Sequence, residues 1–433
     1  MRIVSKKSAP NRRAAPTGLI FWPAAAHGAF LWYNTAKMRF HVPGADGAEE
    51  RMSMKYFVVF CAVLSCAAQQ AARSAAQNVA DFDRNMSVQG GAVFGGLKWI
   101  DGKKLPIEGR AFDDVSHWYD RLPSNVTANV NAGVRSLKRH TSGMSFRFST
   151  DSRKLSFKWV PYFGRLSMDH MPSTGTSGID VYRFDSGTGR WLYVKTGRIS
   201  SAKGGRLDID WTPGTPCLVN LPLYNGVRSF SLGVETNAVV APLGPRKSGL
   251  SKPVVFYGTS ITHGGCASRP GMSFVNIVGR RLDVPVVNLG FSGSGAMELE
   301  MSDHLARIDA GCYVLDCLWN MGMTSDKPRK GRNVDENYEP FIRNLRRKRP
   351  DVPIVMAEMC DVYRQEKNSK NRCMKALYEK LKAEGWKNLV YLPNDGMYPD
   401  DGEGTVDGVH PNDWGMMHLA EAFGKAVREA LGI

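Results

Sequence analysis

The chain has 433 residues, of which 43% are hydrophobic, so it can bury a sizeable core and does not have the composition of a disordered protein. Its formal charge is +16, and the sequence contains no run of five or more like charges. The densest basic cluster, residues 343–349, ends a helical pattern and lacks the aromatic-rich basic motifs of nucleic-acid-binding proteins, so we predict no nucleic-acid partner.

Residues 54–68 resemble a secretory signal peptide, because Lys55 precedes an apolar run of about a dozen residues and small residues follow. The run is too short for a comfortable membrane span, so we predict no transmembrane segment. We expect residues 1–53 to be an over-extended gene start, residues 54–76 to be the signal peptide, and the protein to be periplasmic or secreted. Residues 63–66 also resemble a loose lipobox, which leaves a lipid anchor at Cys66, as in an outer-membrane lipoprotein, as an alternative.

Six cysteines follow residue 76, and none of them forms a CxxC pair or a Cys/His spacing typical of zinc sites. We expect mostly buried thiols and leave one disulfide open. The sequence contains no Walker loop and no dinucleotide fingerprint either. We therefore predict neither a metal nor a cofactor.

Residues 77–248 have the pattern of an all-β domain. Short alternating runs, separated by turn-rich pieces, occur at 144–149, 154–160, 178–184, 191–195, 217–221 and 229–234. Many short strands with turns between them predict a β-sandwich of the jelly-roll kind. We expect residues 242–249, rich in proline and glycine, to link this domain to the C-terminal half of the chain.

Residues 249–433 change to a strand–helix alternation. The expected strands are nearly continuous apolar runs, at 253–257, 284–289, 312–318, 353–358 and 388–392. This pattern predicts a parallel sheet that is covered on both faces by helices. In such sheets, ligands bind beyond the carboxyl ends of the strands, so residues that follow strands are candidates for the site.

Three side chains have the types and spacing of nucleophilic catalysis. The first predicted strand ends at Gly258 and is followed by Ser260. Asp407 and His410 lie three residues apart in a loop that precedes the last helical pattern. A carboxylate that close can accept the Nδ1 proton of the imidazole, which leaves Nε2 free to act as a base toward a hydroxyl. A serine at a strand end is usually only a turn residue, so the pairing of these segments carries the prediction.

Two further strand ends carry groups suited to an anion. The second strand is followed by residues 288–295 (NLGFSGSG), whose glycines, including Gly293, allow backbone N–H groups to line a concavity. The third strand runs toward Asn320, whose side-chain amide can donate hydrogen bonds. Each segment alone could equally be a turn or a strand-end cap. An acyl-transfer enzyme needs such donors around the developing oxyanion.

These segments resemble, in order, the four motif blocks of the SGNH/GDSL hydrolases, over roughly residues 252–433. The resemblance implies a flavodoxin-like three-layer domain and a serine esterase without a cofactor. By that similarity, Ser260 is the nucleophile, His410 is the base, and Asp407 orients the base. The N–H groups of Ser260 and Gly293 and the side chain of Asn320 would form the oxyanion hole.

The chain departs from the family pattern at two positions. Thr259 stands where the first block usually has Asp, and Met321 stands where an Asp often follows the third-block Asn. Neither position belongs to the catalytic machinery that the resemblance implies. We therefore expect an active enzyme. These two changes could alter its substrate preference.

Stretches of the β half, at residues 118–123, 168–171 and 178–182, resemble the GxDLY domain that precedes certain bacterial SGNH hydrolases. A sandwich joined to an SGNH domain is also similar in layout to exported carbohydrate acetyl-esterases. We therefore expect an acylated carbohydrate as substrate, most simply an acetyl ester. A lipid or lysophospholipid esterase and a non-catalytic carbohydrate-binding protein are the alternatives.

The remaining histidines and aromatic residues are weaker candidates. His263 is close to Ser260 in sequence, and we expect it to line the pocket, with Asp407 and His410 better spaced for a base. We interpret Asp169 and His170 as structural or interface groups, and His304 and His418 as ordinary helix residues. The candidates for a sugar subsite are Glu358, Trp319 and Trp414.

Overall fold

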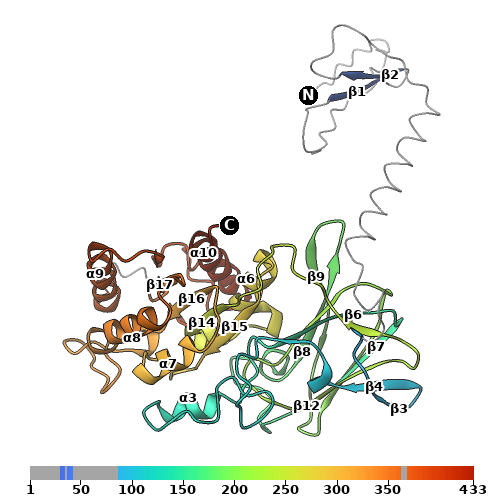
Figure 1. The fold of residues 1–433 in the computed structure, drawn as a ribbon, viewed down its shortest axis with the longest axis horizontal. Helices are drawn as coiled ribbons and strands as arrows, with labels where there is room; N and C mark the ends of the chain where they lie inside the picture. Colours follow the sequence, from blue (N-terminus) through green and yellow to red (C-terminus); the bar gives the residue numbers. More distant parts are fainter. Residues whose placement is uncertain (1–29, 35–36, 42–85, 362–367) are drawn as a thin grey trace, which may run out of the picture. The chain divides into compact units, whose positions relative to one another are not determined.

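The computed structural model describes residues 86–361 and 368–433, together with strands β1 (Phe30–Asn34) and β2 (Lys37–His41), which pair antiparallel. Residues 1–77 and 78–433 form separate compact units. Apart from β1 and β2, the predicted gene start, the signal peptide and Cys66 lie outside the described residues. The second unit contains residues 78–433 and so nearly all of both predicted domains; its described residues are those from β3 to α10 in Figure 1.

Two antiparallel sheets form a β-sandwich in the N-terminal half of this unit (Figure 1). The first sheet has the order β10-β7-β12-β4-β3, and the second has the order β13-β6-β11-β8-β9, with β5 paired to β6. The strands are β3 (Ala92–Phe94), β4 (Leu97–Asp101), β5 (Ile107–Glu108), β6 (Ser145–Thr150), β7 (Lys154–Pro161), β8 (Ile179–Asp185), β9 (Arg190–Gly197), β10 (Gly205–Asp210), β11 (Cys217–Asn220), β12 (Val227–Glu235) and β13 (Val240–Pro242). Short helical turns connect some of them: η2 (Gly102–Lys104), α3 (Ala132–Leu137) and α4 (Ser173–Thr176).

The sandwich core consists of alternate residues of facing strands. Phe146 and Phe148 on β6 pack with Phe157 and Trp159 on β7 and with Phe230 on β12, and all five are at most 1% exposed. Because successive side chains of a strand point to opposite faces, this alternation is what the sequence pattern predicts for a sandwich. The all-β prediction for these strands is confirmed.

The C-terminal half is built on a five-stranded parallel sheet with the order β15-β14-β16-β17-β18. The chain therefore starts next to one edge and then winds outward, which is the strand order of flavodoxin-like folds. The strands are β14 (Val254–Gly258), β15 (Val286–Gly290), β16 (Cys312–Asp316), β17 (Ile354–Ala357) and β18 (Leu389–Leu392).

Helices cover both faces of this sheet (Figure 1). Val254 and Phe256 pack into the cluster that contains α6 (Phe274–Leu282) and α10 (Asp413–Leu431). Val255 and Tyr257 point the other way, into the cluster that contains α7 (Leu299–Ala306), α8 (Val334–Lys348) and α9 (Ser369–Ala383). Strands buried on both sides explain the continuous apolar runs of the sequence, and the three-layer flavodoxin-like prediction is confirmed. Shorter turns are α5 (Ser260–His263), η3 (Pro270–Met272) and η4 (Leu318–Asn320).

A segment of the N-terminal half packs against this second sheet rather than inside the sandwich. Phe112, Leu122, Val130 and Val134 belong to the same buried cluster as Val255 and Tyr257. Residues 109–143 contain no strand and include helix α3. The sequence pattern did not reveal this segment, because its apolar residues follow neither a period of two nor a sustained helical period. The core of the C-terminal half is therefore completed by residues from the N-terminal half.

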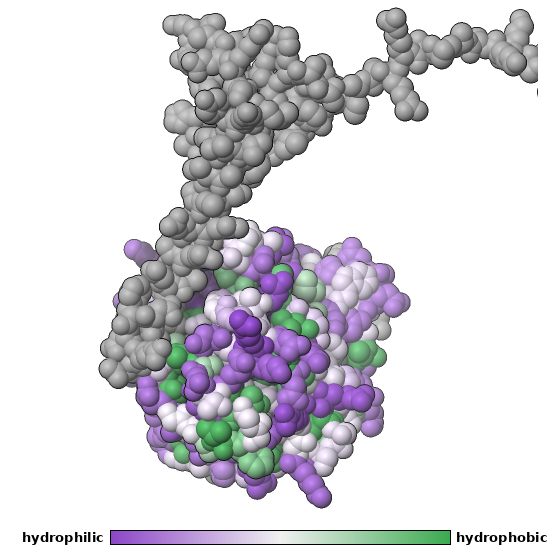
Figure 2. Space-filling view, turned by 90° about the vertical axis from the view of Figure 1, so that its right-hand side faces the viewer, coloured by the Kyte–Doolittle hydropathy of each residue, from purple (hydrophilic) through white to green (hydrophobic). Residues whose placement is uncertain are grey.

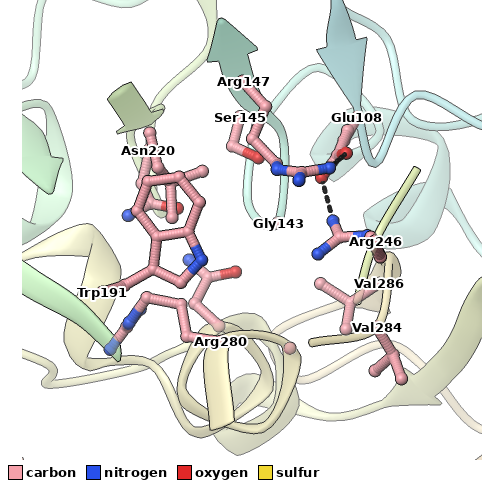
Figure 3. Close-up of a pocket in the computed structure, with 13 residues that line it drawn as sticks. Glu108, Gly143, Ser145, Arg147, Trp191, Asn220, Arg246, Arg280, Val284 and Val286 are labelled. Atoms are coloured by element: carbon pink, nitrogen blue, oxygen red, sulfur yellow. Dashed lines mark hydrogen bonds and ion pairs between the residues drawn. The ribbon is translucent and has the colours of Figure 1, made fainter. Parts of the chain in front are cut away.

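Ion pairs also join the two halves. Arg246, in the stretch that we expected to be a linker, bonds Glu108 of the sandwich and Asp283 at the end of α6, the latter at 3.0 Å. Glu108 also pairs with Arg147 at 2.9 Å. Figure 3 shows Glu108, Arg147 and Arg246 around a small pocket beside Trp191. The pocket volume is about 30 Å³, which is room for one or two water molecules. This pocket therefore fits solvent at a domain junction better than a sugar.

The cysteines, the helices and the surface add three observations. In the part of the chain that the structure describes, all six cysteines are free thiols, so no disulfide forms among them. None of the described helices is long and apolar enough to cross a bilayer. Figure 2 shows one face of the molecule, on which polar side chains dominate and apolar ones form small separate patches.

Candidate active site

Strand β14 ends in a tight turn that presents Ser260 at the start of α5. Thr259 caps this helix, because its hydroxyl accepts a hydrogen bond from the amide of Ile261 (3.3 Å). A Cβ atom on Gly258 would lie 2.1 Å from Oγ1 of Thr262. Glycine is therefore required at position 258, because only its bare backbone lets α5 turn back over the strand. Ser260 keeps 8% of its surface exposed.

The loop before α10 brings a histidine and a carboxylate to this serine. Nε2 of His410 lies 2.9 Å from Oγ of Ser260, and Nδ1 of His410 lies 2.7 Å from Oδ2 of Asp407. The other carboxylate oxygen of Asp407 accepts hydrogen bonds from the backbone amides of His410 (2.7 Å) and Val409 (3.0 Å). The carboxylate thus fixes both the imidazole ring and its loop. The structure brings together all three residues that the sequence spacing singled out.

The electrostatics of this arrangement favour an ionised Asp407. Partial burial alone would raise the pKa of Asp407, but hydrogen bonds from His410 and Val409 outweigh it and hold the pKa below its usual value. An ionised carboxylate accepts the Nδ1 proton of His410. Nε2 is then left with a free lone pair directed at the Ser260 hydroxyl, which is the protonation pattern of a general base.

The two other predicted anion-binding residues lie on neighbouring strand ends. Gly293 follows β15 with φ of 65°, and a Cβ atom placed there would meet no atom within 4 Å, so its backbone borders open space. Asn320 lies at the end of η4, and its amide nitrogen donates to the carbonyl oxygens of Phe291 (3.3 Å) and Gly295 (3.0 Å). The Asn320 side chain therefore holds the glycine loop in this structure. To donate to a bound anion, the Asn320 amide would have to give up the longer of these two hydrogen bonds, the one to Phe291.

Residues of the sandwich half reach this site, and the sequence patterns gave no role to most of them. The hydroxyl of Tyr224 donates to the carbonyl oxygen of Ser260 (3.0 Å). The ring of His170, which we interpreted only as a structural or interface group, lies 6.0 Å from the ring of His410. His170 is exposed, so it can contact a bound substrate. Periodicity cannot find such residues, because they come from loops between strands.

His263 lies beneath the site instead of lining it. It is 0% exposed, its ring is stacked on Tyr224 with centroids 4.2 Å apart, and its Nε2 lies 3.2 Å from Nδ1 of His140. Burial, together with the charge of Arg121, holds the pKa of His263 well below its usual value. The expectation that His263 lines the pocket is wrong. The reason is that α5 turns its C-terminal end into the protein while Ser260 faces outward.

The three candidates for a sugar subsite differ in exposure. Glu358 is engaged with the hydroxyl of Tyr391 and the amide of Asn394 (2.9 Å). Trp319 is half-buried and donates from its indole to the carbonyl oxygen of Cys360 (2.7 Å). Trp414, on the first turn of α10, is 47% exposed. Of the three, Trp414 is the one exposed residue, and Trp319 and Glu358 are partly buried.

The other predicted histidines lie where the patterns placed them. His304 lies on α7 and His418 lies on α10, where it packs edge-on against Trp414. Among the residues that the structure describes, no three His, Cys, Asp or Glu side chains gather in a way that could hold a metal ion.

The chain is similar to known families and to solved structures. Residues 251–428 match the GDSL-like lipase/acylhydrolase family, and residues 97–240 match the N-terminal domain of SGNH-hydrolase-type esterases. No curated protein sequence matches the chain. Many solved structures do, and three of them illustrate the range.

A protein from Bacteroides ovatus that is named as a GDSL-like lipase is 26% identical, over 78% of this chain and 98% of its own, with a TM-score of 0.67. A salicylyl-acyltransferase from a tetracycline biosynthetic pathway is 19% identical, over 79% of this chain and 99% of its own, with a TM-score of 0.63. A family two carbohydrate esterase from Clostridium thermocellum, solved with cellohexaose, is 14% identical, over 67% of this chain and 93% of its own, with a TM-score of 0.50. The last two show a shared fold.

The family matches cover both halves that the structure resolves into a sandwich and a three-layer domain. They also confirm the family that the four sequence blocks resembled. The C-terminal half of the chain is therefore an ester-bond hydrolase domain of the SGNH/GDSL type, and the N-terminal half is the GxDLY domain of SGNH esterases.

Proposed function

We propose that the protein is an exported serine esterase that removes short acyl groups, most simply acetyl, from carbohydrates. The observation that carries the proposed mechanism is the hydrogen-bonded chain from Oγ of Ser260 through His410 to Asp407, with links of 2.9 and 2.7 Å. A nucleophile, a base and an orienting carboxylate in contact are the arrangement of nucleophilic catalysis.

The proposed reaction has two steps. Oγ of Ser260 forms a bond to the ester carbonyl carbon while His410 takes the hydroxyl proton at Nε2, and the carbonyl π electrons move onto the oxygen. Collapse of this tetrahedral intermediate breaks the bond to the alcohol, which receives the proton from His410. Water, deprotonated by the same imidazole, then attacks the acyl-enzyme, and Ser260 leaves with its proton restored.

The oxyanion would be held at the glycine loop. The amides of Ser260 and Gly293 are proposed as donors, since Gly293 borders open space next to the serine helix. Asn320 joins them after exchanging its 3.3 Å bond to Phe291 for one to the substrate oxygen. A fixed donor at a developing negative charge is worth about 10²–10³ in turnover. Asn320→Ala should therefore lower kcat by about this factor.

The carbohydrate part of the proposal is supported by residues around the triad. Trp414 is exposed four residues beyond His410, and an aromatic ring in this position suits the apolar face of a sugar. The exposed His170 offers a polar group on the sandwich side. A carbohydrate esterase with bound cellohexaose shares the fold. The competing substrate class is a lipid ester, which is favoured by the lipase named among the similar structures.

A panel of esters tests the proposal. We expect acetyl esters to be cleaved much faster than octanoyl or longer esters, and acetylated oligosaccharides faster than simple aryl acetates. Ser260→Ala should abolish each activity. Trp414→Ala should lower the rate on oligosaccharides more than the rate on aryl acetates. The control variant is Trp386→Ala, since the Trp386 ring is half-buried and lies beside Arg343 and Arg346. A preference for long-chain esters, with no acetate released from any acetylated glycan, would move the assignment to a lipid esterase.

Export is a separate part of the proposal and rests on the sequence alone. N-terminal sequencing of the protein from its native host should find a mature end between about Cys66 and Gln77. An exported chain that begins at Met1 would show that residues 1–53 belong to the mature protein. Labelling with fatty acid would decide whether Cys66 carries a lipid.

A further inference from the structure

Arg121 is a buried arginine that comes from the sandwich half and lies below the glycine loop of the active site. It is 1% exposed. Nη1 donates to the carbonyl oxygens of Asn288 (3.1 Å) and Gly290 (2.8 Å), at the end of β15, and Nη2 donates to the carbonyl oxygen of Leu137 (2.9 Å). The guanidinium also lies 4.6 Å from the ring centre of Phe291. It thus contacts the point from which the loop with Gly293 departs.

Among the residues that the structure describes, this guanidinium has no carboxylate partner. No carboxylate in the described parts of the chain forms an ion pair with Arg121, and the neighbouring Asp120 pairs with Arg139 instead (3.3 Å). Two arginines that join segments of the molecule are neutralised: Arg246 bonds Glu108 and Asp283, and Arg269 bonds Asp180 (2.8 Å). A buried charge with only carbonyl and aromatic partners is costly, so its position calls for a reason.

One imidazole ring, that of His263, lies between this charge and the Ser292 amide of the glycine loop. Nη2 of Arg121 lies 3.4 Å from Nε2 of His263, and Nδ1 of the same ring accepts a hydrogen bond from the amide of Ser292 (3.4 Å). The network therefore assigns the ring proton to Nε2, which faces Nδ1 of His140 (3.2 Å). His263 and His140 both stay neutral, because burial and the charge of Arg121 lower both pKa values, that of His140 to about 3.

We propose that Arg121 is a positioning residue of the active site, which fixes the glycine loop and sets a buried positive charge behind the oxyanion that forms at Ser260. The inference rests on the proposed serine mechanism. It assigns a role in catalysis to the GxDLY half of the chain, in addition to any contact that this half makes with substrate. Residues 118–123, which resembled the GxDLY domain, are the stretch that contains Arg121.

The physical argument concerns where negative charge appears. The ester substrate is neutral, and charge develops on its oxygen only in the transition state. A fixed positive charge in a water-poor region therefore stabilises the transition state more than the bound substrate. It acts without reorganisation, because the carbonyls of β15 and the ring of Phe291 hold the guanidinium in place. Its loss should accordingly appear in kcat and not in KM.

The experiment compares two variants of the full chain. Arg121→Gln keeps hydrogen-bond donors for the carbonyls but removes the charge, whereas Arg121→Lys keeps the charge. We expect Arg121→Gln to lower kcat for an aryl acetate by roughly 10- to 100-fold, with little change in KM, and Arg121→Lys to recover most of the loss. The rate at which a phosphonate ester modifies Ser260 should fall by the same factor, because that reaction also builds an oxyanion.

Arg280 provides a matched control. It also has a buried nitrogen without a partner, packs 4.2 Å from the ring centre of Tyr182, and donates to a carbonyl oxygen, that of Gly271 (2.6 Å). Arg280→Gln should lower thermal stability without lowering the kcat of the folded enzyme. Equal losses of kcat in the Arg121→Gln and Arg280→Gln variants would overturn the inference.

Two outcomes separate this inference from the mechanism on which it rests. An inactive Ser260→Ala enzyme together with a fully active Arg121→Gln enzyme would reject only the role of Arg121. A fully active Ser260→Ala enzyme would reject the serine mechanism itself. If Arg121→Gln does not fold, the Arg121→Lys variant tests the inference alone. A kcat within about threefold of wild type supports a role for the positive charge at position 121, and a larger loss rejects that role.

Discussion

The two sides of helix α5 carry the same chemical groups and do different things. On the outer side, Ser260, His410 and Asp407 form a hydrogen-bonded chain that solvent can reach. On the inner side, Thr262 donates to Asp316 (2.6 Å), and His263 packs against His140. Each side has a hydroxyl, an imidazole and a carboxylate, so residue type alone does not distinguish them.

Burial makes the difference. Hydrogen bonds keep the pKa of the outer carboxyl, Asp407, low, whereas burial raises the pKa of the inner carboxyl, Asp316, to about 7. The inner imidazole, His263, is held neutral, and no carboxylate of the described residues orients it. A base needs both access to its substrate and a partner for its second nitrogen. The environment of the outer set therefore suits proton transfer, and that of the inner set suits a role in holding the helix.

Replacing His410 should have the largest effect on turnover. His410→Ala should lower kcat by about 10³ or more, because the base is lost while the fold remains. Added imidazole should restore part of the activity, since the vacated site is reached by solvent. His263→Ala should not respond to imidazole, because that position is sealed. Rescue of the His263 variant, and not of the His410 variant, would show that the base had been assigned to the wrong side of α5.

Asp407→Asn should have the next largest effect, of about 10²–10⁴ in kcat. The amide would donate to Nδ1 of His410 and so force the ring proton onto Nε2, where it faces Ser260 instead of accepting its proton. The loop should stay in place, because the amide oxygen can still accept from the backbone at residues 409 and 410. A pH–rate profile of both enzymes checks this, and a variant with wild-type kcat would remove Asp407 from the mechanism.

His263→Gln should lower kcat by only about tenfold. Glutamine can still accept from the amide of Ser292, but it cannot stack on Tyr224 as the imidazole does. We expect a lower unfolding temperature and an unchanged shape of the pH–rate profile, since no titrating catalytic group is lost. A new limb in that profile would mean that His263 takes part in proton transfer.

Asp316→Asn should change turnover least and stability in a pH-dependent way. The folded state binds the Asp316 proton more tightly than the unfolded state, whose carboxyl titrates near 3.9. Wild-type stability should therefore fall as pH rises from about 4 to 7 and stay reduced above that. Asparagine has no such penalty and can still accept from Thr262, so the variant should be more stable above pH 7, by about 1–3 kcal/mol.

Urea unfolding at pH 5 and pH 8 tests this difference, with Asp283→Asn as the control, because Asp283 is a carboxylate of the domain junction that pairs with Arg246. The difference in free energy of unfolding between Asp316→Asn and wild type should become smaller as pH falls. An equal difference in free energy of unfolding at pH 5 and pH 8 would mean that the Asp316 carboxyl is not protonated in the folded protein.

A large part of the fold follows from local patterns. Alternating residues such as those of β6 and β7 indicate a sandwich, and continuous apolar runs such as Val254–Gly258 indicate buried parallel strands. Strand ends in a parallel sheet share one edge, so Ser260, Gly293 and Asn320 could be expected near one another. The spacing of Asp407 and His410 predicted the contact that the structure shows at 2.7 Å.

What the patterns missed are contacts between the two halves. Phe112 and Val134 complete the core of the C-terminal half, which the all-β interpretation of their region did not predict. Removal of the N-terminal half would therefore expose the C-terminal core as well as remove any contact of that half with substrate. The environment of His263 was missed for the same reason, since Arg121, His140 and Tyr224 all come from elsewhere in the chain.

The sequence by itself therefore determined the kinds of layers, the order of the motif blocks and the candidate triad, because periodicity and short spacings are local properties of the chain. Only the tertiary structure decided which histidine has access to Ser260, which carboxyl is ionised, and that an arginine from the N-terminal half lies behind the glycine loop. Burial and electrostatic environment depend on residues more than a hundred positions apart, such as Arg121 and Gly290, and no local pattern encodes such contacts.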